Sequence, residues 1–232
     1  MDEPDNFGKA LDLGNNVVDL IKGTGGYFGK YADGIFTEIS CITVDKLKDY
    51  RLRCAIPRKA KLLDTITEEL DKRGIDQTRS VYLKLIEPML EQAFLEEDEE
   101  LQKIWDRLIT NTLDPTFDVE IRYAYIDILK SLTSLDVKIL KYVFDFVSEN
   151  SAYNQKVDLN DCPVSLEKIK DELSTIPFSD IMVSIYNLKR VQCIQEFLYK
   201  SKAVSNFSYS LGSDQYYVLT YLGSALVEAC MK

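Results

Sequence analysis

Carboxylates are the side chains of this sequence that gather most densely, and five of them follow one another without a break. The run consists of Glu96, Glu97, Asp98, Glu99 and Glu100. Consecutive helical residues do not converge on one point, since only positions three or four apart share a face. The chain has no histidine, and the run lacks the glycine of a calcium-binding loop. We therefore expect no metal site. The run is typical of a helix N-terminus, where acids stabilise unpaired N–H groups; a surface for a partner is the alternative.

Positive charge gathers between Lys46 and Lys61. The cations of this stretch are Lys46, Lys48, Arg51, Arg53, Arg58, Lys59 and Lys61. Against the single acid Asp49 they give a net charge of +6, in a chain whose total is −10. Such a stretch can bind nucleic acid, phosphate or an anionic membrane, or it can pair with acidic segments of the same chain or of a second subunit. We favour pairing, with Glu96–Glu100 as one partner, and take both segments as a candidate interaction surface.

Nucleophilic catalysis has little support in the sequence. A cysteine nucleophile needs a base to form its thiolate, and without histidine a Cys–His pair is excluded. The cysteines are dispersed, with no CxxC pair, which is typical of reduced thiols in the cytosol; they are Cys41, Cys54, Cys162, Cys193 and Cys230. A Ser–Lys pair stays open, but no spacing points to one. We expect no enzymatic activity, no cofactor and no small-molecule ligand.

The composition is that of a globular protein with a substantial core. Apolar residues make up 46% of the chain, and no stretch approaches the roughly 18–20 uninterrupted apolar residues of a membrane-spanning helix. The acidic N-terminus carries no basic segment followed by an apolar one, so we expect no secretory signal. The net charge of −10 argues against non-specific binding to nucleic acid or anionic membranes. These features predict a cytoplasmic protein.

Apolar residues recur every three or four positions through most of the first 133 residues, which predicts a helical bundle. The expected helices cover much of Tyr27–Arg73, then Ser80–Leu95, Glu97–Asn111 and Glu120–Leu132. Trp105 is in phase with Leu101 and Leu108, so we expect it in the core. Pro57 should interrupt or kink the first helix, and Gly74 should end it. Before these helices lies a glycine-rich segment, Gly23–Gly34, whose simplest interpretation is a hinge.

Ser134 is expected to cap a helix over Leu135–Asn150, and the composition changes after Asn150. Two short helices should follow, Leu166–Leu173 capped by Ser165 and Asp180–Lys189 capped by Ser179. Strands are expected over Val191–Tyr199 and Gln215–Leu219, and Thr220 should cap a last helix. This order predicts a mainly α protein with two domains: a helical bundle over 1–133, followed over 134–232 by a winged-helix-like module with a small β-hairpin.

DNA reading by this module is not expected. The helix that would enter the major groove begins with Ser179 and Asp180, where base-reading proteins carry Arg, Lys, Asn or Gln. Residues 135–232 hold 10 Lys and Arg against 12 Asp and Glu, a net charge of −2, whereas phosphate neutralisation requires positive charge. Both features favour a protein partner or self-association over nucleic acid.

The pattern Glu-Glu-Asp-Glu-Glu-Leu-x-x-x-Trp-x-x-Leu-Ile-x-Asn at Glu96–Asn111, followed by Asp114-Pro115, resembles the Abi-alpha family of abortive-infection proteins. The same family's pattern is similar upstream, at Pro88, Leu90, Glu91 and Ala93, and downstream, at Ile128–Asp136, Ile139-Leu140, Leu219–Gly223 and Ala229-Cys230. The likeness extends from about Arg51 to the C-terminus. Asp106 departs from it, since family members more often have a small residue after the tryptophan.

The resemblance implies a bacterial role in phage resistance by abortive infection, and it implies no catalytic residues. We therefore expect a non-enzymatic antiphage component that acts through protein–protein contacts. Two alternatives stay open: a nucleic-acid-binding regulator, and an effector that perturbs membranes through Gly23–Gly34.

Overall fold

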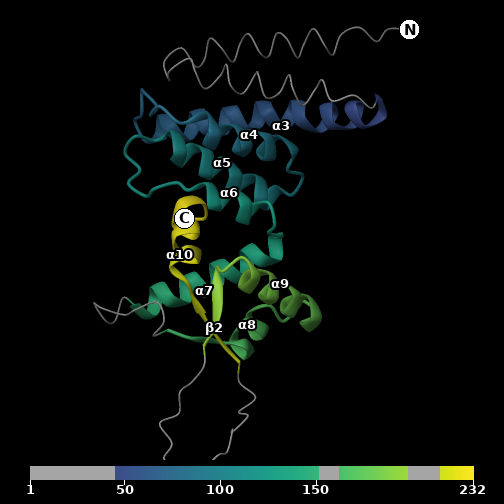
Figure 1. The fold of residues 1–232 in the computed structure, drawn as a ribbon, viewed down its shortest axis with the longest axis vertical. Coiled ribbons are helices and arrows are strands. Elements are labelled where there is room, and N and C mark those ends of the chain that lie inside the picture. Colours follow the sequence, from purple (N-terminus) through teal and green to yellow (C-terminus); the bar gives the residue numbers. More distant parts are fainter. Residues whose placement is uncertain (1–44, 152–161, 198–214) are drawn as a thin grey trace, which may run out of the picture. The chain divides into compact units, whose positions relative to one another are not determined.

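The computed structural model describes residues 45–151, 162–197 and 215–232, with side chains described from Pro57 onward. The chain forms two compact units, which divide after Lys130 (Figure 1). Both are mainly helical, and a small antiparallel sheet belongs to the second, so the expected fold class is confirmed. The glycine-rich segment Gly23–Gly34 lies outside the described residues.

The described part of the first unit is built from α3 (Asp45–Lys72), α4 (Leu83–Leu95), α5 (Glu99–Leu113) and α6 (Tyr123–Leu129). The long helix α3 packs along both α4 and α5, which also pack on each other, and α6 contacts α4 (Figure 1). Their apolar faces form a core with Trp105, 1% exposed, among its largest side chains. The predicted burial of Trp105 is confirmed.

Two residues were expected to interrupt or end α3, and only one of them does so. Gly74 has φ = 68°, a left-handed conformation that glycine adopts without a Cβ clash, and it follows the helix end as predicted. Pro57 lies inside α3, which continues on both sides of it. The prediction of an interruption was therefore wrong. Helix α3 packs on both α4 and α5, and this tertiary packing outweighs the one backbone hydrogen bond that proline removes.

The second unit consists of α7 (Ser134–Ser151), β1 (Val164–Ser165), α8 (Leu166–Glu172), α9 (Phe178–Arg190), β2 (Ile194–Phe197), β3 (Tyr216–Leu219) and α10 (Tyr221–Cys230). The strands pair antiparallel in the order β1-β3-β2, with Val164 opposite Tyr217 and Ile194 opposite Leu219. Helices α9 and α10 both pack on α7. The order of elements is compatible with a winged-helix module, and the two-residue strand β1 is an addition to the expected hairpin.

In the second unit, the start of α10 contacts the turn between α9 and β2. Thr220 caps α10 by accepting a hydrogen bond from Gly223 N at 3.0 Å, as predicted, and its hydroxyl also donates to Cys193 O at 3.0 Å. Gly223 lies so close to this backbone that a Cβ would come within 2.2 Å of Cys193 O. Glycine is required here because two backbones touch.

Two predicted helix caps were displaced. Helix α7 begins at Ser134 itself, so its cap is Thr133, whose N–H donates to Asp136 Oδ2 at 2.7 Å and whose hydroxyl accepts from Asp136 N at 3.3 Å. Helix α9 begins at Phe178, after Pro177, and Ser179 hydrogen-bonds Asp180 instead of capping. Pro177 is the N-cap, with φ −56° and ψ 136°, and a missing N–H at this position removes no hydrogen bond from within the helix. Ser165 caps α8 as predicted.

Candidate functional site

The acidic run forms the start of α5. Asp98 is the N-cap: its Oδ1 accepts hydrogen bonds from Glu100 N at 2.9 Å and Leu101 N at 3.0 Å. Glu96 accepts from the backbone N–H of Asp98 at 3.1 Å, and Glu100 pairs with Lys103 at 2.7 Å. These bonds satisfy N–H groups that a helix start leaves without partners. The interpretation of the run as a helix N-terminus is confirmed.

One cation of the basic stretch is buried in the core of the first unit. Arg58 and Asp106 are each 5% exposed. Arg58 donates from Nη1 to Asp106 Oδ2 at 3.3 Å and from Nη2 to Oδ1, and its remaining hydrogen bonds go to the carbonyls of Ala93 (3.0 Å) and Gln102 (3.2 Å). Burial raises the pKa of Asp106, and the Arg58 charge opposes that shift. The pair ties α3 to α5.

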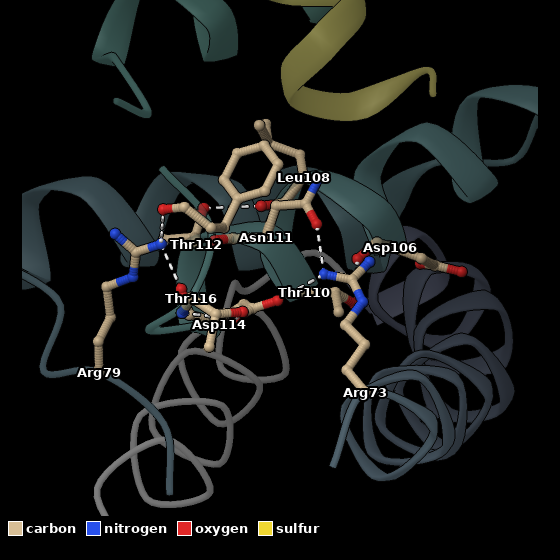
Figure 2. A network of polar contacts seen from close by, with 10 residues as sticks. Arg73, Arg79, Asp106, Leu108, Thr110, Asn111, Thr112, Asp114 and Thr116 are labelled. Atoms are coloured by element: carbon tan, nitrogen blue, oxygen red, sulfur yellow. Dashed lines mark hydrogen bonds and ion pairs between the residues drawn. The ribbon is translucent and has the colours of Figure 1, made fainter. Parts of the chain in front are cut away.

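A second polar network surrounds the C-terminal end of α5 (Figure 2). Arg73, just past the end of α3, donates from Nη1 to Asn111 Oδ1 at 2.7 Å and to Asp114 Oδ2 at 2.8 Å. Asp114 Oδ1 accepts from both the N–H and the hydroxyl of Thr116, at 2.7 and 2.6 Å. Burial by itself would raise the pKa of Asp114, but the hydrogen bonds from Thr116 and Arg73 lower it overall.

Arg79 approaches the same helix end from the segment before α4 (Figure 2). Its side-chain Nη2 donates to the carbonyls of Asn111 (3.1 Å), Asp114 and Phe117 (2.9 Å). The backbone N–H of Arg79 donates to Leu113 O at 2.8 Å. The last carbonyls of a helix have no partner within it, and this helix end is buried. A guanidinium satisfies these carbonyls and opposes the negative end of the helix dipole.

The remaining residues of the predicted interaction surface are placed as follows. Helix α3 contains Lys46, Lys48, Arg51 and Arg53, whose side chains the structure does not describe. Lys59 is half-buried, and Lys61 is exposed, 3.4 Å from Gln102 Oε1. Glu97, Glu99 and Glu100 are exposed around the start of α5. Arg58 takes Asp106 as its acidic partner and is too deeply buried to belong to a surface.

An uncovered face of a different kind lies on α9. Val183 and Tyr186 are 67% and 59% exposed there, whereas Ile181, Ile185 and Leu188 on the opposite face are fully buried. Asp180 lies at the start of the exposed face and Arg190 at its end, and both are exposed. This face was not in the predicted surface. The spacing of Val183 and Tyr186 could have revealed it, because apolar residues three apart opposite a core stripe have no place in that core.

A chain of hydrogen bonds holds the end of α9. Asn187 donates from Nδ2 to Ser131 O at 2.8 Å and to Asp136 Oδ2 at 2.9 Å, which orients its amide. Its Oδ1 then accepts from Nε and Nη2 of Arg190 at 3.0 and 2.8 Å. Beside this chain, burial and the Asp136 charge raise the pKa of the Cys193 thiol to about 12. This shift disfavours the thiolate, which is the nucleophilic form of cysteine.

The family model described as abortive infection alpha matches residues 58–230 of the chain. The chain belongs to this family. Comparison with curated proteins gave no match, and comparison with solved structures gave none either. The resemblance carried by the acidic run, the tryptophan helix and Leu219–Gly223 is thus confirmed. The match begins at Arg58, which is the cation of the buried pair.

The residues that carry the resemblance have structural roles in this chain. Asp98 caps α5, Trp105 fills the core, Asn111 and Asp114 hold Arg73, and Gly223 permits the contact of α10 with Cys193. Among the described residues no group of three potential metal-binding side chains occurs, and no helix among them is long and apolar enough to cross a membrane. The described motif residues therefore build the scaffold, and the uncovered face of α9 is the candidate site for a partner.

Proposed function

We propose that this protein is a non-enzymatic component of abortive infection that acts in the cytoplasm through protein–protein contacts. The family membership supports the defence setting. The mechanism rests on one observation: the exposed face of α9 carries Val183 and Tyr186, flanked by opposite charges at its two ends. Depletion of charge at the centre and enrichment in tyrosine are features of protein interfaces.

Within this proposal the second unit is a winged-helix module whose α9 occupies the position of the recognition helix. A helix that reads base edges presents Arg, Lys, Asn or Gln from its N-terminal part. Here that part presents Asp180, a carboxylate that phosphate repels, and residues 135–232 carry a net charge of −2. The same fold element is therefore better suited to a protein surface than to DNA.

The buried polar residues of α5 and its C-cap support the non-enzymatic part of the proposal. Asp106, Asn111 and Asp114 are buried, and their side chains are engaged by Arg58 and Arg73. A general acid or base must reach the proton that it transfers, and these groups are instead occupied in holding α5. Their chemistry is that of a scaffold.

Phage challenge of cells that express single-residue variants tests the proposal. Val183→Asp places a charge at the centre of the α9 face and should abolish protection, so that plating efficiency rises to that of cells without the protein. Because Val183 is exposed, the melting temperature should stay within a degree or two of the parent. Tyr82→Asp is the matched control: Tyr82 is 87% exposed and lies in the other unit. Full protection by Val183→Asp would contradict the proposal.

A further inference from the structure

The charges on the exposed face of α9 would pair with those of an identical helix lying antiparallel to it. In helical projection Asp180, Val183, Tyr186 and Arg190 fall on one arc opposite the buried residues. The acid begins the face, the base ends it, and the two apolar side chains lie between. The midpoint between Asp180 and Arg190 is residue 185, which is also nearly midway between Val183 and Tyr186.

We propose that α9 is a self-association surface, on which α9 of a second copy of this chain packs antiparallel across a two-fold axis near residue 185. This rests on the proposed function, that the protein works through protein contacts, and names the partner. In a two-fold interface residue i meets j while j meets i. The axis therefore brings Val183 of each copy against Tyr186 of the other. It also brings Asp180 of each copy to Arg190 of the other, so that two ion pairs flank an apolar centre.

The basic end of this face is held in place before any partner arrives. Asn187, fixed by Ser131 and Asp136, accepts two hydrogen bonds from the Arg190 guanidinium. Those bonds use Nε and Nη2, so the N–H groups of Nη1 can donate to Asp180 of the second copy. Holding a long side chain in its bound orientation removes part of the entropy cost of association. Lys189, by contrast, pairs with Glu196 at 2.9 Å within the unit.

The apolar centre has no explanation in helix stability. Valine and tyrosine are among the weaker helix formers, and at 67% and 59% exposure they contribute little to the core. Packed against each other across the axis they would lose that exposure. One 13-residue helix pair makes a small interface, and small interfaces are weak and transient. We expect a dimer that forms with rising concentration.

Charge exchange tests the antiparallel geometry. Sedimentation of the full chain from about 1 μM to about 1 mM, the range that brackets weak dimers, should show a monomer–dimer equilibrium. Asp180→Arg would set arginine against Arg190 twice, and Arg190→Asp would set aspartate against Asp180 twice. Each single variant should raise the dissociation constant at least about tenfold, and the double variant should restore it. Failure of the double variant to restore association, or a parent that stays monomeric throughout, would overturn the inference.

Replacing apolar residues of the α9 face by aspartate distinguishes failure of this inference from failure of the proposed function. Tyr186→Asp should weaken self-association at least about tenfold, while Tyr82→Asp should leave it unchanged. Equal weakening by both would show that α9 is not the interface. If Val183→Asp loses phage protection although sedimentation shows no dimer in the parent, the proposed function stands and the second copy is the wrong partner. If the dimer is present but protection survives its disruption, the proposed function fails and the inference stands.

Discussion

Arg58 and Asp106, 48 residues apart in sequence, form a buried ion pair that joins α3 to α5. The guanidinium also donates to two carbonyls, so the pair is accompanied by further hydrogen bonds. Removing two charges from water is costly, and such a pair is maintained only when its hydrogen bonds are well satisfied. The carboxylate of Asp106 is thus held in the core by Arg58.

The first prediction concerns this pair. Arg58→Met leaves Asp106 buried without a counter-charge and should lower the free energy of unfolding by roughly 3–5 kcal/mol. The double variant Arg58→Met with Asp106→Leu removes both charges and should recover most of that loss. Chemical denaturation of the parent, both single variants and the double variant measures the coupling. Simple additivity of the two losses would show that the residues do not act as a pair.

The second prediction concerns pH. Because the folded state lowers the pKa of Asp114 below its ordinary value of 3.8, the ionised carboxylate contributes stability above that pH. The contribution is lost as pH falls through the lower, folded pKa. Asp114→Asn should therefore cost about 1–3 kcal/mol at neutral pH, and the difference from the parent should shrink in acid. Asp118→Asn, at an exposed position, is the control. A difference that is constant with pH would refute the assignment.

The third prediction concerns Gly223. A Cβ at this position would lie 2.2 Å from Cys193 O and 2.9 Å from its carbonyl carbon, and both belong to backbone. Gly223→Ala should therefore destabilise the second unit by about 1–3 kcal/mol, the usual cost of overpacking, although alanine is the better helix former. Ser224→Ala, one residue along α10, should change stability far less. Thermal melting measures both effects, and a raised melting temperature for Gly223→Ala would be incompatible with the close contact between Gly223 and the Cys193 backbone.

The fourth prediction concerns the basic stretch, from which Arg58 must now be left out because its burial would confound the result. Reversing Arg51, Arg53 and Lys59 to Glu should reduce stability or association, most strongly at low salt, where charge interactions reach farthest. Melting and light scattering at two ionic strengths measure this. Unchanged stability together with loss of binding to RNA, DNA or anionic vesicles would identify an anion site instead of a paired surface.

Local sequence rules predicted the elements well where one residue type decides the outcome. The acids before α5, the glycine after α3 and Thr220 before α10 each satisfy unpaired backbone groups of a neighbouring helix end, which needs no knowledge of the rest of the chain. The rules failed where neighbours compete. Thr133 and Ser134 are both of a type that caps helices. Thr133 is the cap here because it forms two reciprocal hydrogen bonds with Asp136.

The site could be predicted only in part, because charge counting does not register burial. Arg58 was counted with its basic neighbours, yet it faces Asp106 in the core. Arg73 was correctly placed at the end of α3, but its partners Asn111 and Asp114 are 38 and 41 residues away. Long side chains reach partners set by tertiary packing. Periodicity alone could have identified the α9 face, since Val183 and Tyr186 oppose the core stripe.

Helix α9 is proposed to contact protein and not to read nucleic acid. Titration of labelled duplex DNA with the full chain, at about 50 mM and about 200 mM salt, tests it most directly, because phosphate contacts make affinity fall steeply with salt. We expect no saturable binding at either salt concentration. Binding that is tight at low salt, falls steeply at high salt and is lost in Tyr186→Asp would contradict this expectation, and would assign α9 to a groove of DNA.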